Sequence, residues 1–167
     1  SDGLQVESLI QAAKASSQPP QAVFLTPSHQ FPTGATLSLD RRLAIIEWAH
    51  QHHSWIIEDD YDSEFHYDGL PTACVQGLDR HQRTLYVGTF GKTLYPGLRM
   101  GYMALPPALV DAFTRARSIL DGHTPQTHQL TLARFMGDGD GRIALCPGGV
   151  DIEQAINVGI DGEIFRD

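Results

Sequence analysis

The sequence predicts an α/β fold with a mostly parallel sheet, and three observations support this class. Compact apolar runs at Ala22–Leu25 and Trp55–Ile57 are bounded by proline or polar residues, which is typical of buried strands. Between them, apolar residues recur at helical spacing up to about Gln51. Polar, chemically active stretches then follow directly on the strands, where ligands collect in such sheets. Strand, helix and strand in this order is the pattern of an α/β sheet.

Each element of the amino-terminal half has a local sequence signal. A short helix is predicted over Leu4–Ala15, and Pro19-Pro20 ends it. The next loop, Thr26–Thr36, is rich in Pro, Ser and Gly. Ser38 can cap the helix that follows. The apolar face of that helix expected to meet the core consists of Leu39, Leu43, Ile46 and Ala49.

The carboxy-terminal half is predicted to contain two further strands and then two helices. Thr84–Thr89 and Leu98–Leu105 are predicted strands. Pro106-Pro107 opens a helix, since proline is favourable at the first helical position, and Gln126–Met136 is predicted as the last helix. From Asp138 onward the sequence is glycine-rich without a clean amphipathic period, so we expect a small hairpin or a loose segment. In the helix that Pro106-Pro107 opens, four apolar residues fall on one side, namely Leu109, Phe113, Ala116 and Leu120.

The composition narrows the classes of protein. The chain has 167 residues and a formal net charge of −8. This length suits one domain, and the acidic balance argues against contact with nucleic acid, because neutralising phosphates needs a basic face. Cys74 and Cys146 are the only cysteines and form neither a zinc motif nor a disulfide framework, so we expect a reducing cytoplasm. No apolar run is long enough to span a membrane.

The polar stretches fall at three strand ends. Ser28–Gly34 follows the first strand, Asp59–Tyr61 follows the second and Thr89–Lys92 follows the third. Because the carboxyl ends of parallel strands lie at one edge of the sheet, the sequence predicts a ligand site built from these three stretches.

Lys92 has more than one interpretation. Gly91-Lys92-Thr93 is similar to the tail of a phosphate-binding P-loop, but that motif needs a glycine at the position of Tyr86. Lys14 and Lys92 are the only lysines, so lysine is not the routine surface charge of this chain. A surface charge and a chemical role, such as that of a nucleophilic amine, are therefore comparable interpretations of Lys92, and the neighbouring residues decide between them.

The acidic run that begins at Glu58 also has several interpretations. Most of it is expected to be a solvated loop. A calcium loop of the EF-hand type beginning at Asp60 would need glycine at the position of Phe65, and a magnesium site has no further support, so no metal is predicted. Asp59 comes at the end of a buried strand, where a carboxylate must find a cationic partner or shift its pKa upward.

These residues fit the requirements of pyridoxal phosphate. This cofactor needs a lysine for covalent attachment, a carboxylate that keeps the pyridine nitrogen protonated, and a phenol or amide on the ring hydroxyl. Small residues and an arginine bind its phosphate. The residues that can fill these roles at neighbouring strand ends are Lys92, Asp59, Tyr61, Thr89 and Arg99.

Four longer stretches point to a particular family. They are LTPSHQFPTGATLSLDRRLAIIEWA, IIEDDYDSEFHYDGLP, YVGTFGKTLYPGLRMGYMALP and QLTLARFMGDG. In their order and spacing the chain resembles the aminotransferase-like domain of the MocR-type regulators, a branch of the GntR transcription factors. These join a winged-helix DNA-binding domain to a fold-type-I pyridoxal phosphate domain. The resemblance implies that residues 1–138 are part of the three-layer α/β/α large domain of fold-type-I enzymes.

The resemblance also implies a role for each candidate residue. Lys92 matches the catalytic lysine that forms a Schiff base with the cofactor. Asp59 matches the acid on the pyridine nitrogen, and Tyr61 the phenol on the ring hydroxyl. Thr89 and Arg99 match phosphate contacts.

Three further positions qualify the resemblance. We expect His29 to support the site structurally rather than to act in catalysis. Phe31 replaces the asparagine of ordinary aminotransferases, which favours the regulator branch over a metabolic enzyme. Gly91 replaces the serine usual in the family, and the lost hydroxyl and looser backbone are expected to weaken phosphate binding. Residues 139–167 no longer resemble the family, so we expect a truncated or frame-shifted product with an unrelated tail.

Three functional hypotheses stay open at this point. The first is an effector-domain fragment of a transcriptional regulator that binds pyridoxal phosphate and a small-molecule amine or amino acid. Such a domain is a homodimer in the intact family, and we expect no contact between this fragment and nucleic acid or membrane. The second is an active class I/II aminotransferase in which Lys92 transfers protons, although the fragment alone is expected to be inactive. The third is a non-functional truncated remnant.

Overall fold

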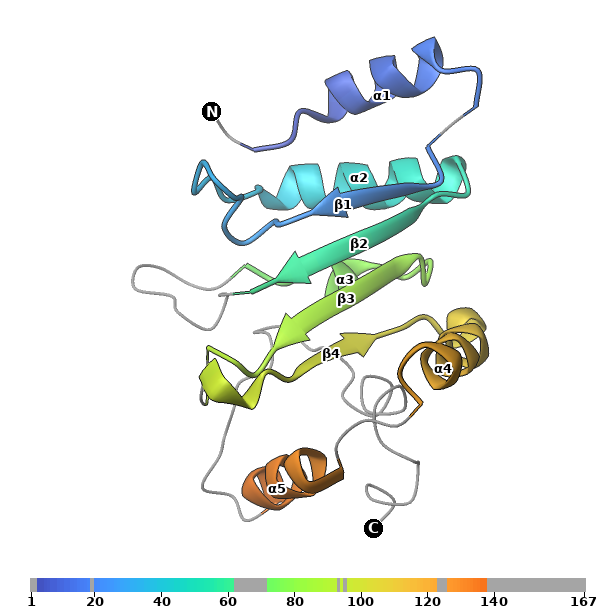
Figure 1. The fold of residues 1–167 in the computed structure, drawn as a ribbon. Helices are drawn as coiled ribbons and strands as arrows, with labels where there is room; N and C mark the ends of the chain where they lie inside the picture. Colours follow the sequence, from blue (N-terminus) through green and yellow to red (C-terminus); the bar gives the residue numbers. More distant parts are fainter. Residues whose placement is uncertain are drawn as a thin grey trace.

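The computed structural model describes residues 3–18, 20–61, 72–92, 94, 96–122 and 126–137. In this part of the chain, helices and strands alternate as far as β3, and the four strands form one sheet (Figure 1). The elements are α1 Val6–Ala15, β1 Ala22–Leu25, α2 Leu39–Gln51, β2 Trp55–Asp60, α3 Val75–Leu78, β3 Thr84–Thr89, the 3-10 helix η1 Pro96–Leu98, β4 Gly101–Ala104, α4 Pro107–Asp121 and α5 Gln126–Gly137.

The four strands lie in the order β1-β2-β3-β4, with three parallel strands and one antiparallel edge strand. The parallel register places Leu25 beside Glu58, and Asp59 beside Val87. β4 returns antiparallel and pairs Gly101 with Thr89. The reversal follows from the connection between β3 and β4, which is too short for the crossover that a parallel pair needs. The predicted α/β class with a mostly parallel sheet is therefore confirmed.

The main core lies between one face of the sheet and the first helices. Residues of β1 and β2 alternate between buried and more exposed positions, so each strand presents one covered face. In Figure 1, α2 and α3 lie behind the sheet on that face. Phe24, on the opposite face, is 61% exposed. The cluster consists of Val6, Val23, Leu25, Leu37, Ile45, Ile46, Trp48, Ala49, Ile56 and Val75.

The buried face of α2 differs from the predicted one. Ile46 and Ala49 are buried as expected, but Leu39 and Leu43 are each 47% exposed. Their place toward the core is taken by Arg42, which is 1% exposed. The prediction failed because it considered only the apolar residues of the helix, whereas this guanidinium finds hydrogen-bond acceptors inside the protein.

Several smaller differences concern the ends of elements. The fourth strand is shorter than predicted and begins at Gly101, after the 3-10 turn η1. Ser38 precedes α2 as expected, but its side chain makes no capping hydrogen bond. Leu120 on α4 is 81% exposed rather than packed. The short helix α3 has no counterpart in the sequence prediction.

A second cluster supports the connection between β3 and β4. Phe90 and Leu132 are both 6% exposed and pack together, with Leu98, Met100 and Met136 around them. Through this contact α5 holds the segment that follows β3, which includes Lys92. Within the described part of the chain, no helix is both long and apolar enough to cross a membrane. Residues 139–167, for which the sequence predicts an unrelated tail, lie outside the described residues.

Candidate functional site

The three predicted stretches come together at the carboxyl ends of the parallel strands. The phenol of Tyr61, just after β2, donates a hydrogen bond of 2.8 Å to the backbone carbonyl of His29, in the loop after β1. The ammonium Nζ of Lys92, in the turn after β3, lies 4.4 Å from the centre of the Tyr61 ring. At this distance the cation is attracted by the ring face. Tyr61 therefore links the other two strand ends.

Asp59 is the acidic member of this group. Its side chain is partly exposed and lies on the same face of the sheet as Phe24. Burial raises the pKa of the Asp59 carboxyl above its usual range, the neighbouring charge of Asp60 raises it further, and the Lys92 ammonium acts in the opposite direction. Of the influences on the Asp59 pKa, Lys92 is the one positive charge, and its side chain is exposed. The Asp59 carboxylate would gain from a second positive charge.

The acids on either side of Asp59 face the covered side of the sheet. Glu58 is fully buried and accepts hydrogen bonds of 2.8 Å from the backbone N–H groups of Val75 and Gln76 at the start of α3. Burial raises the pKa of Glu58 to about 7, although these donors and the charge of Arg42 lower it. Asp60 is 3% exposed and accepts a 2.6 Å hydrogen bond from the phenol of Tyr86.

The predicted phosphate residues lie farther along the β3–β4 connection. The Thr89 hydroxyl accepts a hydrogen bond of 3.1 Å from the backbone N–H of Gly91 and lies 3.4 Å from the carbonyl of Met100. A Cβ added to Gly91 would approach that hydroxyl to 3.3 Å, a tight contact. Arg99 has an exposed side chain and a positive φ of 49°, a backbone region that non-glycine residues adopt rarely. Strain of this kind is often found at functional sites.

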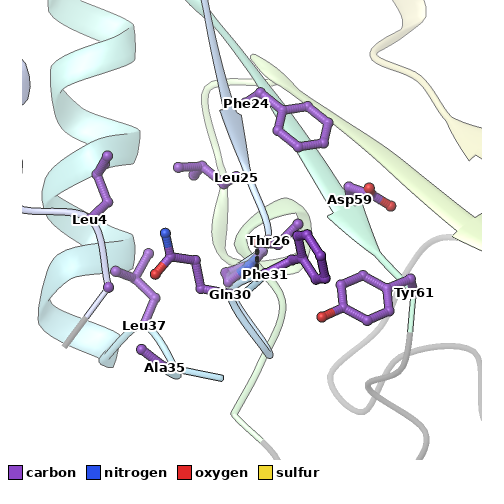
Figure 2. Close-up of a pocket in the computed structure, with 12 residues that line it drawn as sticks. Leu4, Phe24, Leu25, Thr26, Gln30, Phe31, Ala35, Leu37, Asp59 and Tyr61 are labelled. Atoms are coloured by element: carbon purple, nitrogen blue, oxygen red, sulfur yellow. Dashed lines mark hydrogen bonds between the residues drawn. The ribbon is translucent and has the colours of Figure 1, made fainter. Parts of the chain in front are cut away.

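A cavity of about 470 Å³ opens beside Asp59 and Tyr61. Figure 2 shows these two side chains near the rings of Phe24 and Phe31. Phe31 is 78% exposed at this edge. The wall away from the acid is apolar and includes Leu4 and Leu37. The cavity therefore joins a polar end, where two of the predicted residues lie, to an apolar end that the sequence did not predict.

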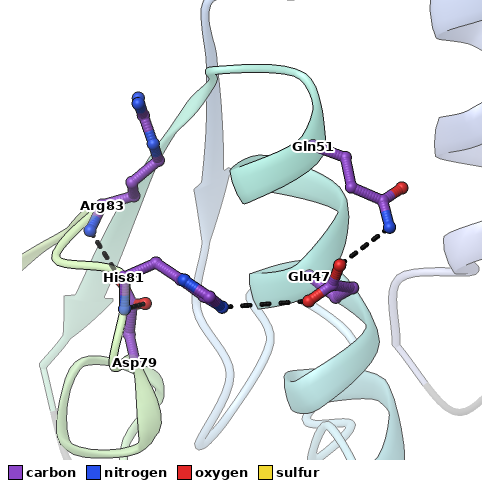
Figure 3. A network of polar contacts seen from close by, with 5 residues as sticks. All are labelled: Glu47, Gln51, Asp79, His81 and Arg83. Carbon is purple, nitrogen blue, oxygen red and sulfur yellow. Dashed lines mark hydrogen bonds and ion pairs between the residues drawn. The ribbon is translucent and has the colours of Figure 1, made fainter.

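A second polar group lies at the opposite end of the sheet (Figure 3). There, Glu47 of α2 accepts a 2.8 Å hydrogen bond from Gln51 and lies 3.8 Å from the ring of His81. Asp79 accepts hydrogen bonds of 2.8 Å from the backbone N–H groups of His81 and Arg83. In the part of the chain that the structure describes, no group of three or more His, Cys, Asp or Glu side chains could hold a metal ion.

Residues 2–141 match the family described as aminotransferase class I and II, and the chain belongs to this family. The fold of the described residues agrees, since the chain is similar to Pyrococcus horikoshii kynurenine aminotransferase, solved in complex with PMP. That likeness has a TM-score of 0.78 at 31% identity and covers 83% of this chain and 35% of the other. The predicted class, part of a fold-type-I large domain, is thereby confirmed.

More specific similarity is to segments of transcriptional regulators. The chain is 44% identical over 127 residues to an uncharacterized HTH-type transcriptional regulator, YdeL, of Bacillus subtilis, covering 76% of this chain and 27% of YdeL. It is also 44% identical over 121 residues to the probable rhizopine catabolism regulatory protein MocR of Rhizobium meliloti, covering 72% and 24%. The chain thus spans about a quarter of the length of these relatives.

Proposed function

We propose that this chain is the pyridoxal phosphate-binding part of the aminotransferase-like effector domain of a MocR-type transcriptional regulator. One observation carries the proposal: Asp59 and Tyr61, at the end of β2, line one cavity, and the ammonium of Lys92, in the turn after β3, lies over the ring of Tyr61. An acid, a phenol and an amine are the three groups that the ring of this cofactor needs. When bound, pyridoxal phosphate supplies an electron sink for reactions of amines.

Each of the three side chains has a state suited to its proposed role. The amine of Lys92 is exposed and therefore accessible to an aldehyde. The Asp59 carboxyl, whose pKa is raised by burial, would hold a proton on a pyridine nitrogen and be stabilised by the positive charge created there. The phenol of Tyr61 is fixed by the carbonyl of His29, which orients it for a second hydrogen bond to a ring hydroxyl.

The phosphate end of the site rests on Thr89 and Arg99. Thr89 pairs with Gly101 across β3 and β4, and Arg99 precedes that residue by two positions. Both residues therefore belong to the same β3–β4 junction. A forked guanidinium suits a phosphate, and the exposed side chain of Arg99 can move toward one. We assign His29 a supporting role, because its contribution to the described geometry is the carbonyl that orients Tyr61.

The regulator assignment rests on the relatives and on Phe31. The two regulators named above share 44% identity with this chain, against 31% for the kynurenine aminotransferase. Phe31 replaces the asparagine expected in an ordinary aminotransferase. Such a regulator would bind an amine or amino acid as effector and act as a homodimer. The second candidate is an active aminotransferase, which the structural likeness to aminotransferases favours.

Covalent labelling tests cofactor binding. The chain is incubated with pyridoxal phosphate, reduced with borohydride and mapped by mass spectrometry. Lys14, the other lysine, is exposed on α1 and serves as an internal reference. We expect the adduct predominantly at Lys92, and its loss in Lys92→Ala. Equal labelling of the two lysines would show that no site is formed.

Turnover separates the two candidate functions. The loaded chain is mixed with a panel of amino acids and a keto acid acceptor. A regulator domain predicts a saturable change in cofactor absorbance with at most one equivalent of keto acid per chain. Sustained formation of the keto acid that derives from the amino acid donor, over many equivalents per chain, would favour the aminotransferase.

A further inference from the structure

Arg42 is a buried cation that donates hydrogen bonds to three backbone carbonyls. It lies on α2 and is 1% exposed. Its Nε donates to the carbonyl of Leu37 at 2.9 Å. One terminal nitrogen donates to the carbonyl of Pro27 and the other to that of Ala73, each at 3.0 Å. A planar fork with donors in several directions suits this arrangement, and a lysine ammonium does not.

Two of the three acceptors are the ends of one loop. Pro27 and Leu37 also bond to each other, through the N–H of Leu37 and the carbonyl of Pro27 at 2.9 Å. Inside this closed loop, Gln30 donates its N–H to the carbonyl of Ala35 at 2.9 Å. Arg42 therefore closes the base of a loop that is already braced internally. The loop is the one that contains Phe31 and the carbonyl of His29.

The third acceptor belongs to the segment before α3. Ala73 lies two residues before Val75, whose N–H group binds Glu58 together with that of Gln76. The charge of Arg42 also acts on the Glu58 carboxyl. The guanidinium thus joins the loop after β1 to the segment before α3.

A continuous set of contacts leads from Arg42 to the candidate site. The loop that Arg42 closes presents the carbonyl of His29, which accepts the 2.8 Å hydrogen bond from Tyr61. The ring of Tyr61 in turn lies under the ammonium of Lys92. We propose that Arg42 is a positioning residue for Tyr61: by fixing the 27–37 loop it fixes the carbonyl that orients the phenol and, through it, Lys92. The relevance to cofactor binding rests on the proposed function, whereas the link from Arg42 to Tyr61 does not.

The test uses Arg42→Lys, with Arg41→Lys as a matched control. Arg41 is the neighbouring residue on α2, and its guanidinium donates a hydrogen bond of 3.5 Å to the side chain of Gln5. Tetranitromethane nitration of each tyrosine is measured by mass spectrometry without cofactor. In Arg42→Lys we expect Tyr61 nitration to rise roughly tenfold relative to buried Tyr86, the factor that one hydrogen bond contributes. General loosening of the fold would raise both rates together.

A reciprocal measurement covers the case in which Arg42→Lys does not fold. Coupling between two sites acts in both directions. In Tyr61→Phe, which removes one hydrogen bond at a partly exposed residue, exchange of the Arg42 Nε proton followed by NMR should accelerate several-fold. Tyr86→Phe is the control for general loosening, and exchange of the Arg42 proton, compared at equal free energy of unfolding, should be faster only in Tyr61→Phe.

The outcomes separate the two proposals. An unchanged ratio of Tyr61 to Tyr86 nitration in folded Arg42→Lys, or unchanged Arg42 exchange in Tyr61→Phe, overturns the positioning role. Absence of selective Lys92 labelling in the unmodified chain overturns the proposed function and leaves the link between Arg42 and Tyr61 intact. If both hold, Arg42→Lys should also lower the ratio of Lys92 to Lys14 labelling, while Arg41→Lys preserves it.

Discussion

The two faces of the sheet provide different environments for three consecutive acidic residues of β2. Glu58 and Asp60 point to the covered face, where backbone N–H groups and the Tyr86 phenol satisfy them. Asp59, between them, points to the open face beside a cavity, with the exposed Lys92 as its cationic neighbour. The pleat of the strand alone produces this division. Adjacent acidic residues of one strand can therefore stabilise the fold on one face of the sheet and be available for ligand binding on the other.

The covered face buries three charged side chains within an apolar core. Arg42, Glu58 and Asp60 are each at most 3% exposed. Their hydrogen bonds hold the loop after β1, the start of α3 and strand β3. Buried charges of this kind are tolerated only when they are paired, so removing one partner should be costly. On the open face, Asp59 and Tyr61 are partly exposed and Lys92 is exposed, so these positions should tolerate substitution better.

The largest expected effect is the loss of Glu58. Glu58→Ala leaves two N–H groups at the start of α3 unpaired and removes the carboxylate next to the Arg42 charge. We expect the free energy of unfolding to fall by about 3–5 kcal/mol, measured by urea denaturation. Glu47→Ala on the exposed side of α2 is the control and should change it by less than about 0.5 kcal/mol. Similar losses in both variants would contradict a special role for the covered face.

A pH titration of stability tests the same residue without deleting it. The pKa of Glu58 rises from 4.5 to about 7 on folding. Between these values the folded state binds more protons at Glu58 than the unfolded state, so the stability that Glu58 contributes is fully present below about pH 4.5 and is lost as pH rises through about 7. The contribution is on the order of 3 kcal/mol. In Glu58→Gln the difference between the two pH values should shrink by this amount, and an unchanged difference would refute the assignment.

A pair of tyrosines sharpens the contrast between the faces. Tyr86→Phe removes the donor to buried Asp60 and should lower stability by about 1–3 kcal/mol. Tyr61→Phe removes a hydrogen bond at a partly exposed site and should lower it by about 1 kcal/mol or less. Pyridoxal phosphate affinity, followed by absorbance, should fall in Tyr61→Phe and be preserved in folded Tyr86→Phe. A larger loss of stability in Tyr61→Phe, or a larger loss of cofactor affinity in Tyr86→Phe, would contradict the proposed difference between the two faces.

The sequence predicted the strand positions and the meeting of three strand ends, because short apolar runs and parallel topology determine both. It did not predict that β4 runs antiparallel, since a strand pattern has no direction. It also missed Arg42 and α3. A buried arginine is recognisable only from its acceptors, and a four-residue helix that contains Gly77 has too little periodicity to detect. The alternation along β2 could have separated Asp59 from Glu58 and Asp60. The boundary between residues 138 and 139 stays a prediction.

The most direct test of the division between the faces compares Asp59→Ala with Asp60→Ala. For each variant, the free energy of urea unfolding and the affinity for pyridoxal phosphate are measured. We expect Asp59→Ala to keep the stability of the parent chain but to bind the cofactor at least about tenfold more weakly. This corresponds to a loss of about 1.4 kcal/mol in the free energy of binding. Asp60→Ala should be destabilised, because the buried Tyr86 phenol loses its acceptor, and should bind cofactor normally while folded. Unchanged affinity in Asp59→Ala, or equal loss of stability in both, would contradict the account.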